Sequence, residues 1–345
     1  MSGFDLASVS VADVDGKELR IDSPMRGVTK LYYSTLCIFY KYLGLELAPV
    51  NVDASFSNWR GQASENPVYL TTNFKKMDQS KKNIAMPSSS HWLLPNWISM
   101  IWRLLPMTWD LITSPHHLKI SLEVARLYLH ALSLSKTKAL SQQAGTIEQW
   151  MDNHYFSKEF QHLYLAPFVA SLGTCTKEHV LAYPAKIILD MVSKWGDDAL
   201  QVVGGVRKVT EKLLEPISEV VFNFEVVGVW KDADSDQILL MDQHGYARLF
   251  DKVVFAGSAH TCRKMLTAEP PFEISALEPQ KEVISILERF TFVPVRVVVH
   301  SDSSLLPLDK SKWRGFNLAV DEAKNTMATI WVNYLQNVNT STGIF

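Results

Sequence analysis

The chain has 345 residues, of which 47% are hydrophobic and 20% charged, as is typical of a globular protein with a large core and two domains. Its formal net charge of −2 includes no basic excess, which argues against nucleic acid as a partner. The three cysteines, Cys37, Cys175 and Cys262, lie far apart without metal-ligand spacing, so a reducing compartment is expected.

The first sixty residues alternate between extended and helical patterns. Residues 1–15 lack the basic start and apolar stretch of a signal peptide, so we expect an intracellular protein, cytoplasmic or peripheral on a membrane. Residues 19–27 predict a short strand that enters a loop. Residues 29–43 predict a helix that Gly44 ends, and residues 47–56 return to an extended pattern.

Residues 91–113 form an apolar segment that contains four tryptophans. Two prolines, Pro95 and Pro106, interrupt it, and its formal charges are Arg103 and Asp110. Three interpretations remain open: a buried or lid-forming helix pair around an apolar cavity, an interfacial membrane attachment, and a membrane span. The first two imply a small apolar substrate, and the second implies peripheral membrane contact through this segment.

The remaining residues mix helices and strands. Helical patterns cover residues 115–132, 146–172, 179–195, 206–215 and 279–289, while strand patterns cover 220–230, 237–242, 246–257, 293–300 and 326–334. The sequence therefore predicts an α/β protein, α+β in parts, with a discontinuous domain and a helix-rich insertion.

The C-terminal part contains several motifs, namely a His-Ser-Asp at residues 300–302, Leu306-Pro307, Trp313, Asn317 and the Asn-x-Leu-Gln of residues 333–336. Together they resemble the motifs of flavin-containing amine-oxidase-like proteins of the FAD/NAD(P)-binding superfamily. Upstream, the Gly204-Gly205 turn before a helix and the strands of residues 220–257 agree with the same family in order and spacing. Phe316 stands where the family usually has Trp.

The resemblance implies FAD as cofactor, with hydride transfer from substrate to flavin and no catalytic metal. Arg26 and Gly27 match positions that line the flavin and its pyrophosphate, Val226 a strand that holds the adenine, and Ala256 and Gly257 a close approach to the cofactor. For Arg26 the alternative is a solvated loop arginine. For Val226 it is a buried strand residue, and for Gly257 an ordinary loop glycine.

Three residues are candidates for the substrate side. The resemblance places Arg296 near the position where amine oxidases have a lysine beside the flavin, which makes it a candidate catalytic residue; an outward-facing strand arginine is the alternative. His300 and Trp313 are candidates for the substrate pocket, although both also fit a purely structural role in the turn that follows the strand.

The phosphate-binding glycine motif of dinucleotide-binding domains is missing from the sequence. No two glycines are separated by a single residue, whereas the motif Gly-x-Gly-x-x-Gly requires such a pair. The resemblance would place this motif before residue 1 and a second FAD-contacting segment after residue 345. We therefore expect a truncated chain that carries an incomplete Rossmann-like FAD-binding domain and a more complete substrate domain.

These patterns predict four regions and two alternative functions. The regions are a remnant of the FAD-binding domain with the start of the substrate domain at 1–57, a helix-rich substrate or lid region at 58–199, a helix and β-meander of the FAD domain at 200–262, and the helix and strands of the substrate domain at 263–345. The predicted function is that of an FAD-dependent oxidoreductase acting on an apolar or lipid-like substrate. The alternative is a non-catalytic remnant that binds a lipid, a membrane or a partner.

Overall fold

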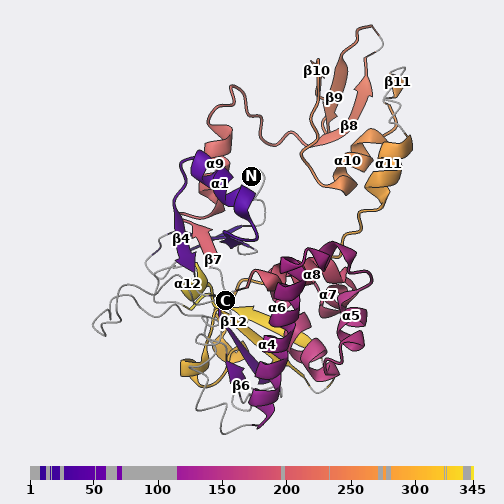
Figure 1. The fold of residues 1–345 in the computed structure, drawn as a ribbon. Coiled ribbons are helices and arrows are strands. Elements are labelled where there is room, and N and C mark those ends of the chain that lie inside the picture. The colour runs from indigo at the N-terminus through magenta and orange to yellow at the C-terminus, as the bar shows by residue number, and fades with distance from the viewer. Residues whose placement is uncertain are drawn as a thin grey trace, which may run out of the picture. The chain divides into compact units, whose positions relative to one another are not determined.

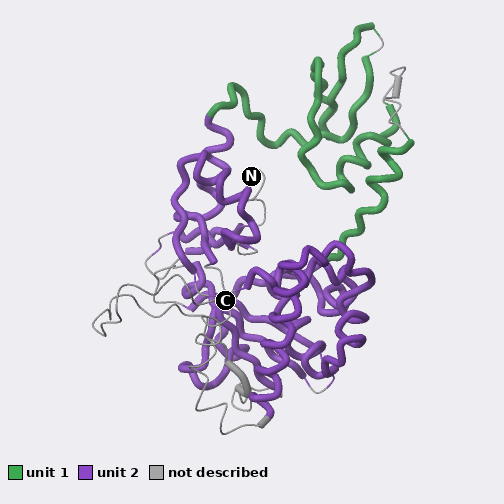
Figure 2. The backbone as a smooth tube through the Cα atoms, viewed as in Figure 1, with its two compact units in different colours: residues 1, 216–294 green, residues 2–215, 295–345 purple. Residues whose placement is uncertain are grey.

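The chain folds into two compact units in the computed structural model. The structure describes residues 8–12, 16, 18–23, 27–50, 52–59, 68–71, 115–195, 199–232, 234–270, 275–276, 281–321, 323, 325–336 and 343–345. One unit spans Pro216–Pro294, and the other combines Ser2–Glu215 with Val295–Phe345 (Figure 2). The larger unit is therefore discontinuous in sequence.

The larger unit is built around a four-stranded mixed sheet. Its strands lie in the order β13 (Thr326–Ile330), β12 (Phe316–Val320), β5 (Ala54–Asn58) and β6 (Val68–Thr71). Strand β12 runs antiparallel to β13 and parallel to β5. All five residues of β12 are buried, as expected for an apolar strand that is covered on both faces. The pairing of β5 with β12 brings the N-terminal and C-terminal parts of the chain into one sheet.

A layer of helices forms the main core together with this sheet (Figure 1). It comprises α4 (Pro115–Lys136), the 3₁₀-helix η5 (Ala139–Gln142), α5 (Ile147–Asn153), the π-helix η6 (Phe160–Leu165), α6 (Ala166–Gly173), α7 (Lys177–Ala182) and α8 (Ala185–Ser193). Helix α5 starts at a capping box, in which Gln149 N–H donates to the Thr146 hydroxyl and Thr146 N–H donates to the Gln149 side chain. Helical periodicity predicted this layer, but not the π-helical turn within it.

A second, smaller sheet in the same unit is antiparallel. Strand β7 (Ala199–Val202) lies between β3 (Val28–Thr29) and β4 (Leu47–Val50). Helices α1 (Ser34–Tyr42) and α9 (Val206–Leu214) contribute Tyr40 and Val209 to its core. Gly44 follows α1 with φ +71°, which agrees with its predicted role as a helix stop. A hairpin of β1 (Val9–Ala12) and β2 (Glu18–Ile21) precedes this sheet in sequence.

The smaller unit is an antiparallel sheet with two helices. The strand order is β10 (Ala247–Phe250), β9 (Ile238–Asp242), β8 (Val226–Lys231) and β11 (Ser275–Ala276), and the helices are α10 (Ala259–Leu266) and α11 (Lys281–Glu288). Trp230 is 2% exposed, and its indole Nε1 donates to the carbonyl of Ala268 at 3.1 Å. The predicted hairpin-linked strands are therefore present as β8, β9 and β10.

The predicted strand at 293–300 is wrong, and the one at 246–257 ends at Phe250. Residues 253–256 and 293–299 have no strand structure, and Val254 and Val297 are 89% and 53% exposed. Both runs are rich in β-branched residues, but neither pairs with another strand in the part of the chain that the structure describes. The predicted strand at 326–334 ends at Ile330, and a short helix α12 (Val332–Leu335) follows.

The fold is thus mixed α/β at the level of class. Among the described residues, β5 and β12 form the only parallel strand pair. The described part of the chain therefore contains no parallel dinucleotide-binding sheet. The division into four regions stays a prediction. Segment 91–113 lies outside the described residues, and none of the described helices has the length and apolar character needed to cross a membrane.

Candidate functional site

A buried carboxylate, Asp53, lies immediately before β5 at the edge of the mixed sheet. The residue is 2% exposed. Its Oδ1 accepts a hydrogen bond from Gly315 N–H at 2.9 Å, and its Oδ2 accepts one from the Tyr334 hydroxyl at 3.1 Å. The guanidinium Nε of Arg314 lies 3.9 Å from Oδ2. Residues from both ends of the chain therefore meet at this carboxylate.

Burial raises the pKa of the Asp53 carboxyl. The hydrogen bonds from Gly315 and Tyr334 and the charge of Arg314 act in the opposite direction, but removal from water has the larger effect. Ionising a carboxyl group in such a setting costs free energy, and the hydrogen bonds described above fix the groups around it. Perturbed carboxylates of this kind occur at functional sites as well as in structural networks.

Asn317 connects three strands beside Asp53. Its Oδ1 accepts from the Ser55 hydroxyl at 2.8 Å and from Arg314 N–H at 3.0 Å. Its Nδ2 donates to the carbonyls of Arg314 at 2.6 Å and Thr329 at 3.3 Å. The side chain is 3% exposed, so these bonds satisfy a buried amide that would otherwise destabilise the fold.

Replacing Asn317 with alanine is expected to lower the free energy of unfolding by about 2 to 3 kcal/mol, because it leaves buried donors and acceptors without partners. Chemical denaturation of the two proteins measures this difference. Asn325→Ala is the matched control: Asn325 is exposed and bonds to Asp321 in a turn, so a loss below about 0.5 kcal/mol is expected. Equal losses in the two variants would contradict the assigned role of Asn317.

An aromatic cluster lies next to Tyr334. Trp331 stacks on Tyr334 with ring centroids 5.3 Å apart, and Trp313 meets Trp331 edge-on at 5.5 Å. Phe345 packs edge-on against Trp313 at 5.7 Å and tilted against His300 at 5.8 Å. The two predicted pocket residues, His300 and Trp313, are thus joined through the ring of Phe345. The resulting surface is aromatic and partly exposed, which suits an apolar ligand.

The polar atoms of the His-Ser-Asp segment hold its turns. The Asp302 carboxylate accepts from Ser304 N–H at 2.8 Å, which lowers the pKa of that carboxyl. Asp302 N–H donates to His300 Nδ1 at 3.2 Å, and the backbones of His300 and Phe345 bond to each other in both directions. The Trp313 indole donates to the carbonyl of Pro307 at 2.6 Å. These contacts position the rings and leave the imidazole of His300 half-buried.

The remaining predicted site residues are spread over both units. Arg26 lies outside the described residues, and Gly27 is half-buried just before β3. Val226 opens β8, and the exposed Ala256 and Gly257 precede α10, all in the smaller unit. Arg296 is exposed in the run that was wrongly predicted as a strand. Within the larger unit, the structure thus brings together His300 and Trp313.

The described residues do not form a complete site for FAD. A helix N-terminus after a glycine turn attracts phosphate, and Gly204-Gly205 before α9 is such a turn. However, the Asp22 carboxylate fills this place: its Oδ2 accepts from Val206 N–H at 3.0 Å. A Cβ on Gly257 would make ordinary contact with Thr261 at 3.9 Å, so the described structure around this residue does not require a glycine.

Sequence reasoning missed Asp53, Arg314 and Tyr334. No local pattern singles out Asp53, because its partners lie 262 and 281 residues away. A signal was present in the C-terminal aromatic segment, which contains Trp331 and Tyr334 close to the predicted Trp313. No group of three His, Cys, Asp or Glu side chains within the described part of the chain is placed to hold a metal ion.

No protein-family model and no curated protein matches the chain. Similar solved structures include three mutants of putrescine oxidase from a structure-based redesign of cofactor binding. The double mutant is 14% identical with a TM-score of 0.44, the triple mutant 13% with 0.45, and the single mutant 13% with 0.48. The matches cover 90%, 90% and 98% of this chain, which spans only 61%, 61% and 65% of those proteins.

Proposed function

We propose that the chain belongs to an FAD-dependent oxidoreductase resembling the flavin amine oxidases, and that it binds an apolar or lipid-like substrate. The observation that supports this proposal is the convergence of the resembling segments on one site. Asp53, which lies far from these motifs in sequence, meets Arg314 and Tyr334 at the end of β5, and Trp331 stacks on Tyr334. In this proposal, the substrate binds at this site.

The residues of the site would bind and orient the substrate. Trp313 and Trp331 offer apolar ring surface, the buried Phe345 packs against Trp313, and Tyr334, which stacks on Trp331, bonds to Asp53. FAD, when bound, supplies the acceptor for the hydride. Gly27, Val226, Ala256 and Gly257 are the proposed cofactor contacts among the described residues, with Arg26 and further residues outside them supplying the rest.

A second candidate function is a non-catalytic protein that binds a lipid, a membrane or a partner. The observation that favours it is the occupation of the α9 N-terminus by the Asp22 carboxylate, at a place that would otherwise suit a phosphate. Peripheral membrane contact through residues 91–113 is part of this candidate. Liposome flotation that is lost when this segment is deleted would support it, and flotation that survives the deletion would argue against it.

Flavin reduction tests the oxidoreductase proposal. The chain is mixed with FAD under anaerobic conditions and screened with apolar amines and unsaturated lipids, and bleaching of the flavin absorption is followed. For a substrate that reduces the flavin, Trp331→Ala is expected to slow reduction about tenfold, the effect of about 1.4 kcal/mol of lost contact. Trp195→Phe, in the helical core against Phe168, is the control and should leave the rate unchanged. No reduction with any compound would favour the second candidate.

A further inference from the structure

Three basic side chains come together on the helical layer. Arg126 and His130 lie one turn apart on α4, and His154 follows directly after α5. The imidazole rings of His130 and His154 are 5.3 Å apart between centroids and nearly perpendicular. All three side chains are half-buried, so they are accessible to a small solute.

Aromatic rings hold these basic groups in place. The His154 ring stacks on Trp150 at 4.0 Å, and His130 meets Trp150 edge-on at 5.8 Å. The Arg126 guanidinium lies over the Phe156 ring at 3.9 Å. Trp150 and Phe156 are both 5% exposed and belong to the main core. The basic groups are therefore ordered before any ligand arrives, which reduces the entropy lost on binding.

The hydrogen-bonding capacity of the three groups is only partly used. Arg126 Nη2 donates to the carbonyl of Tyr155 at 3.0 Å, but Arg126 Nε is buried and makes no hydrogen bond. His154 Nδ1 lies 2.7 Å from the carbonyl of Trp150, so it donates there and leaves Nε2 for another partner. Among the described contacts no hydrogen bond involves the imidazole of His130.

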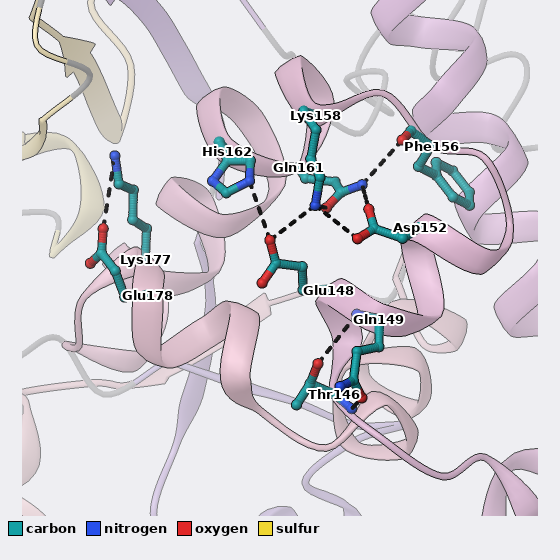
Figure 3. Close-up of polar contacts among 10 residues, drawn as sticks. All are labelled: Thr146, Glu148, Gln149, Asp152, Phe156, Lys158, Gln161, His162, Lys177 and Glu178. Atoms are coloured by element: carbon teal, nitrogen blue, oxygen red, sulfur yellow. Dashed lines mark hydrogen bonds and ion pairs between the residues drawn. The ribbon is translucent and has the colours of Figure 1, made fainter.

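The carboxylates on the surrounding elements are engaged elsewhere. Glu123 of α4 accepts from Ser157 N–H at 2.9 Å and from its hydroxyl at 2.7 Å. Figure 3 shows Asp152 directed toward Lys158 and Gln161, at 2.8 Å in each case.

Two further carboxylates, on α5 and α8, are also paired. Glu148 pairs with Lys158 at 3.0 Å and lies 3.5 Å from His162 (Figure 3). On α8, Asp190 pairs with Lys194 at 2.7 Å. Within the described residues, no salt bridge links Arg126, His130 or His154 to an acid.

We propose that Arg126, His130 and His154 form a binding site for a small oxyanion of the phosphate class. A guanidinium fork and two imidazolium N–H groups are the donors that such an anion prefers. Burial lowers the pKa of His130, and the charges of His154 and Arg126 add to this effect. A bound anion would offset these like charges, so anion binding and histidine protonation should favour each other.

The binding of sulfate at two pH values tests the proposal, because the charge of sulfate stays constant over the range in which histidine titrates. The full chain is titrated at about pH 8 and about pH 5.5, with sodium chloride at matched ionic strength as control, and the ring-proton NMR signals of its histidines are followed. Sulfate is expected to shift the signals of His130 and His154 and to bind about tenfold more tightly at the lower pH, equivalent to about 1.4 kcal/mol.

Variants separate this site from general ion effects. Arg126→Gln and His130→Gln should each weaken sulfate binding about tenfold, while Arg126→Lys, which keeps the charge without the fork, should weaken it less. His162→Gln, at a histidine that already faces Glu148, is the matched control and should bind like the unchanged protein. Affinity that is equal at both pH values, or unchanged in Arg126→Gln and His130→Gln, would overturn the proposal.

Two probes distinguish the source of the anion. Inorganic phosphate represents a free solute, and vesicles that contain phosphatidic acid represent a lipid headgroup. Binding of either that is lost in Arg126→Gln supports the site and identifies the source. Binding of neither overturns it. These outcomes are independent of FAD and of the substrate proposed above.

Discussion

Replacing Asp53 with alanine is expected to lower the free energy of unfolding by about 4 kcal/mol, the largest stability effect predicted for this chain. The change removes the acceptor for Gly315 N–H and for the Tyr334 hydroxyl, and it leaves the Arg314 guanidinium without its carboxylate. Gly315 N–H and the Tyr334 hydroxyl thus lose a buried acceptor, and Arg314 loses its charge partner. Urea denaturation followed by far-UV circular dichroism measures the difference.

Asp53→Asn is the informative comparison. An amide oxygen can still accept from Gly315, and the variant has no charge to bury, so a loss below about 1.5 kcal/mol is expected. Because burial raises the Asp53 pKa, the native state holds this proton more tightly than the unfolded chain does. The free energy of unfolding that this difference contributes is fully present below the pKa of the unfolded chain, near 3.8. It is lost as the pH rises through the higher pKa of the native state.

The asparagine variant should lack this pH dependence, since it has no proton to lose. The stability difference between the two proteins should therefore change over the acidic range just described and stay constant above it. A difference that is constant from acid to neutral pH would contradict the burial of an ionisable Asp53. A loss in Asp53→Ala no greater than in Asp53→Asn would contradict the hydrogen-bond network.

Replacing Gly205 with alanine is expected to cost about 3 kcal/mol of stability. Its φ of +75° with ψ −176° is a backbone conformation that only glycine adopts easily. In addition, a Cβ there would lie 2.9 Å from Asp22 Oδ1 and 3.0 Å from Oδ2. The carboxylate cannot move away freely, because it caps α9 and the Asp22 backbone is bonded on both sides to Gln336.

Gly44→Ala separates the two causes of this loss. Gly44 also has a positive φ, +71°, but a Cβ there would meet nothing within 4 Å. Its replacement should cost about 1 kcal/mol, the price of the backbone conformation alone. Thermal unfolding of the two variants gives the comparison. Losses of equal size would show that Asp22 does not hold the α9 N-terminus as described.

Sequence patterns predicted an element correctly where its partners lie close in sequence or where its apolar residues are buried. The Gly204-Gly205 turn before α9 and the strands β8, β9 and β10 were found in this way. The runs at 253–256 and 293–299 failed because strand propensity only matters once a partner strand is present. Their sequences are typical of strands, but within the described residues neither run pairs with another strand.

The candidate site could be predicted only in part for the same reason. Trp313 and Asn317 were visible because they belong to a motif with fixed spacing. Asp53 became important only through tertiary contacts with residues near the other end of the chain, and a single aspartate before a strand gives no signal of that. The π-helix η6 was likewise hidden, since its residues also fit an ordinary helical period.

The dependence on flavin is tested most directly by the visible absorption spectrum of the purified chain after incubation with excess FAD and desalting. An FAD-dependent oxidoreductase is expected to keep the flavin bands through desalting, in a ratio approaching one flavin per chain. A colourless protein that is folded by circular dichroism would contradict the flavin-dependent function and leave the non-catalytic binding protein as the better explanation.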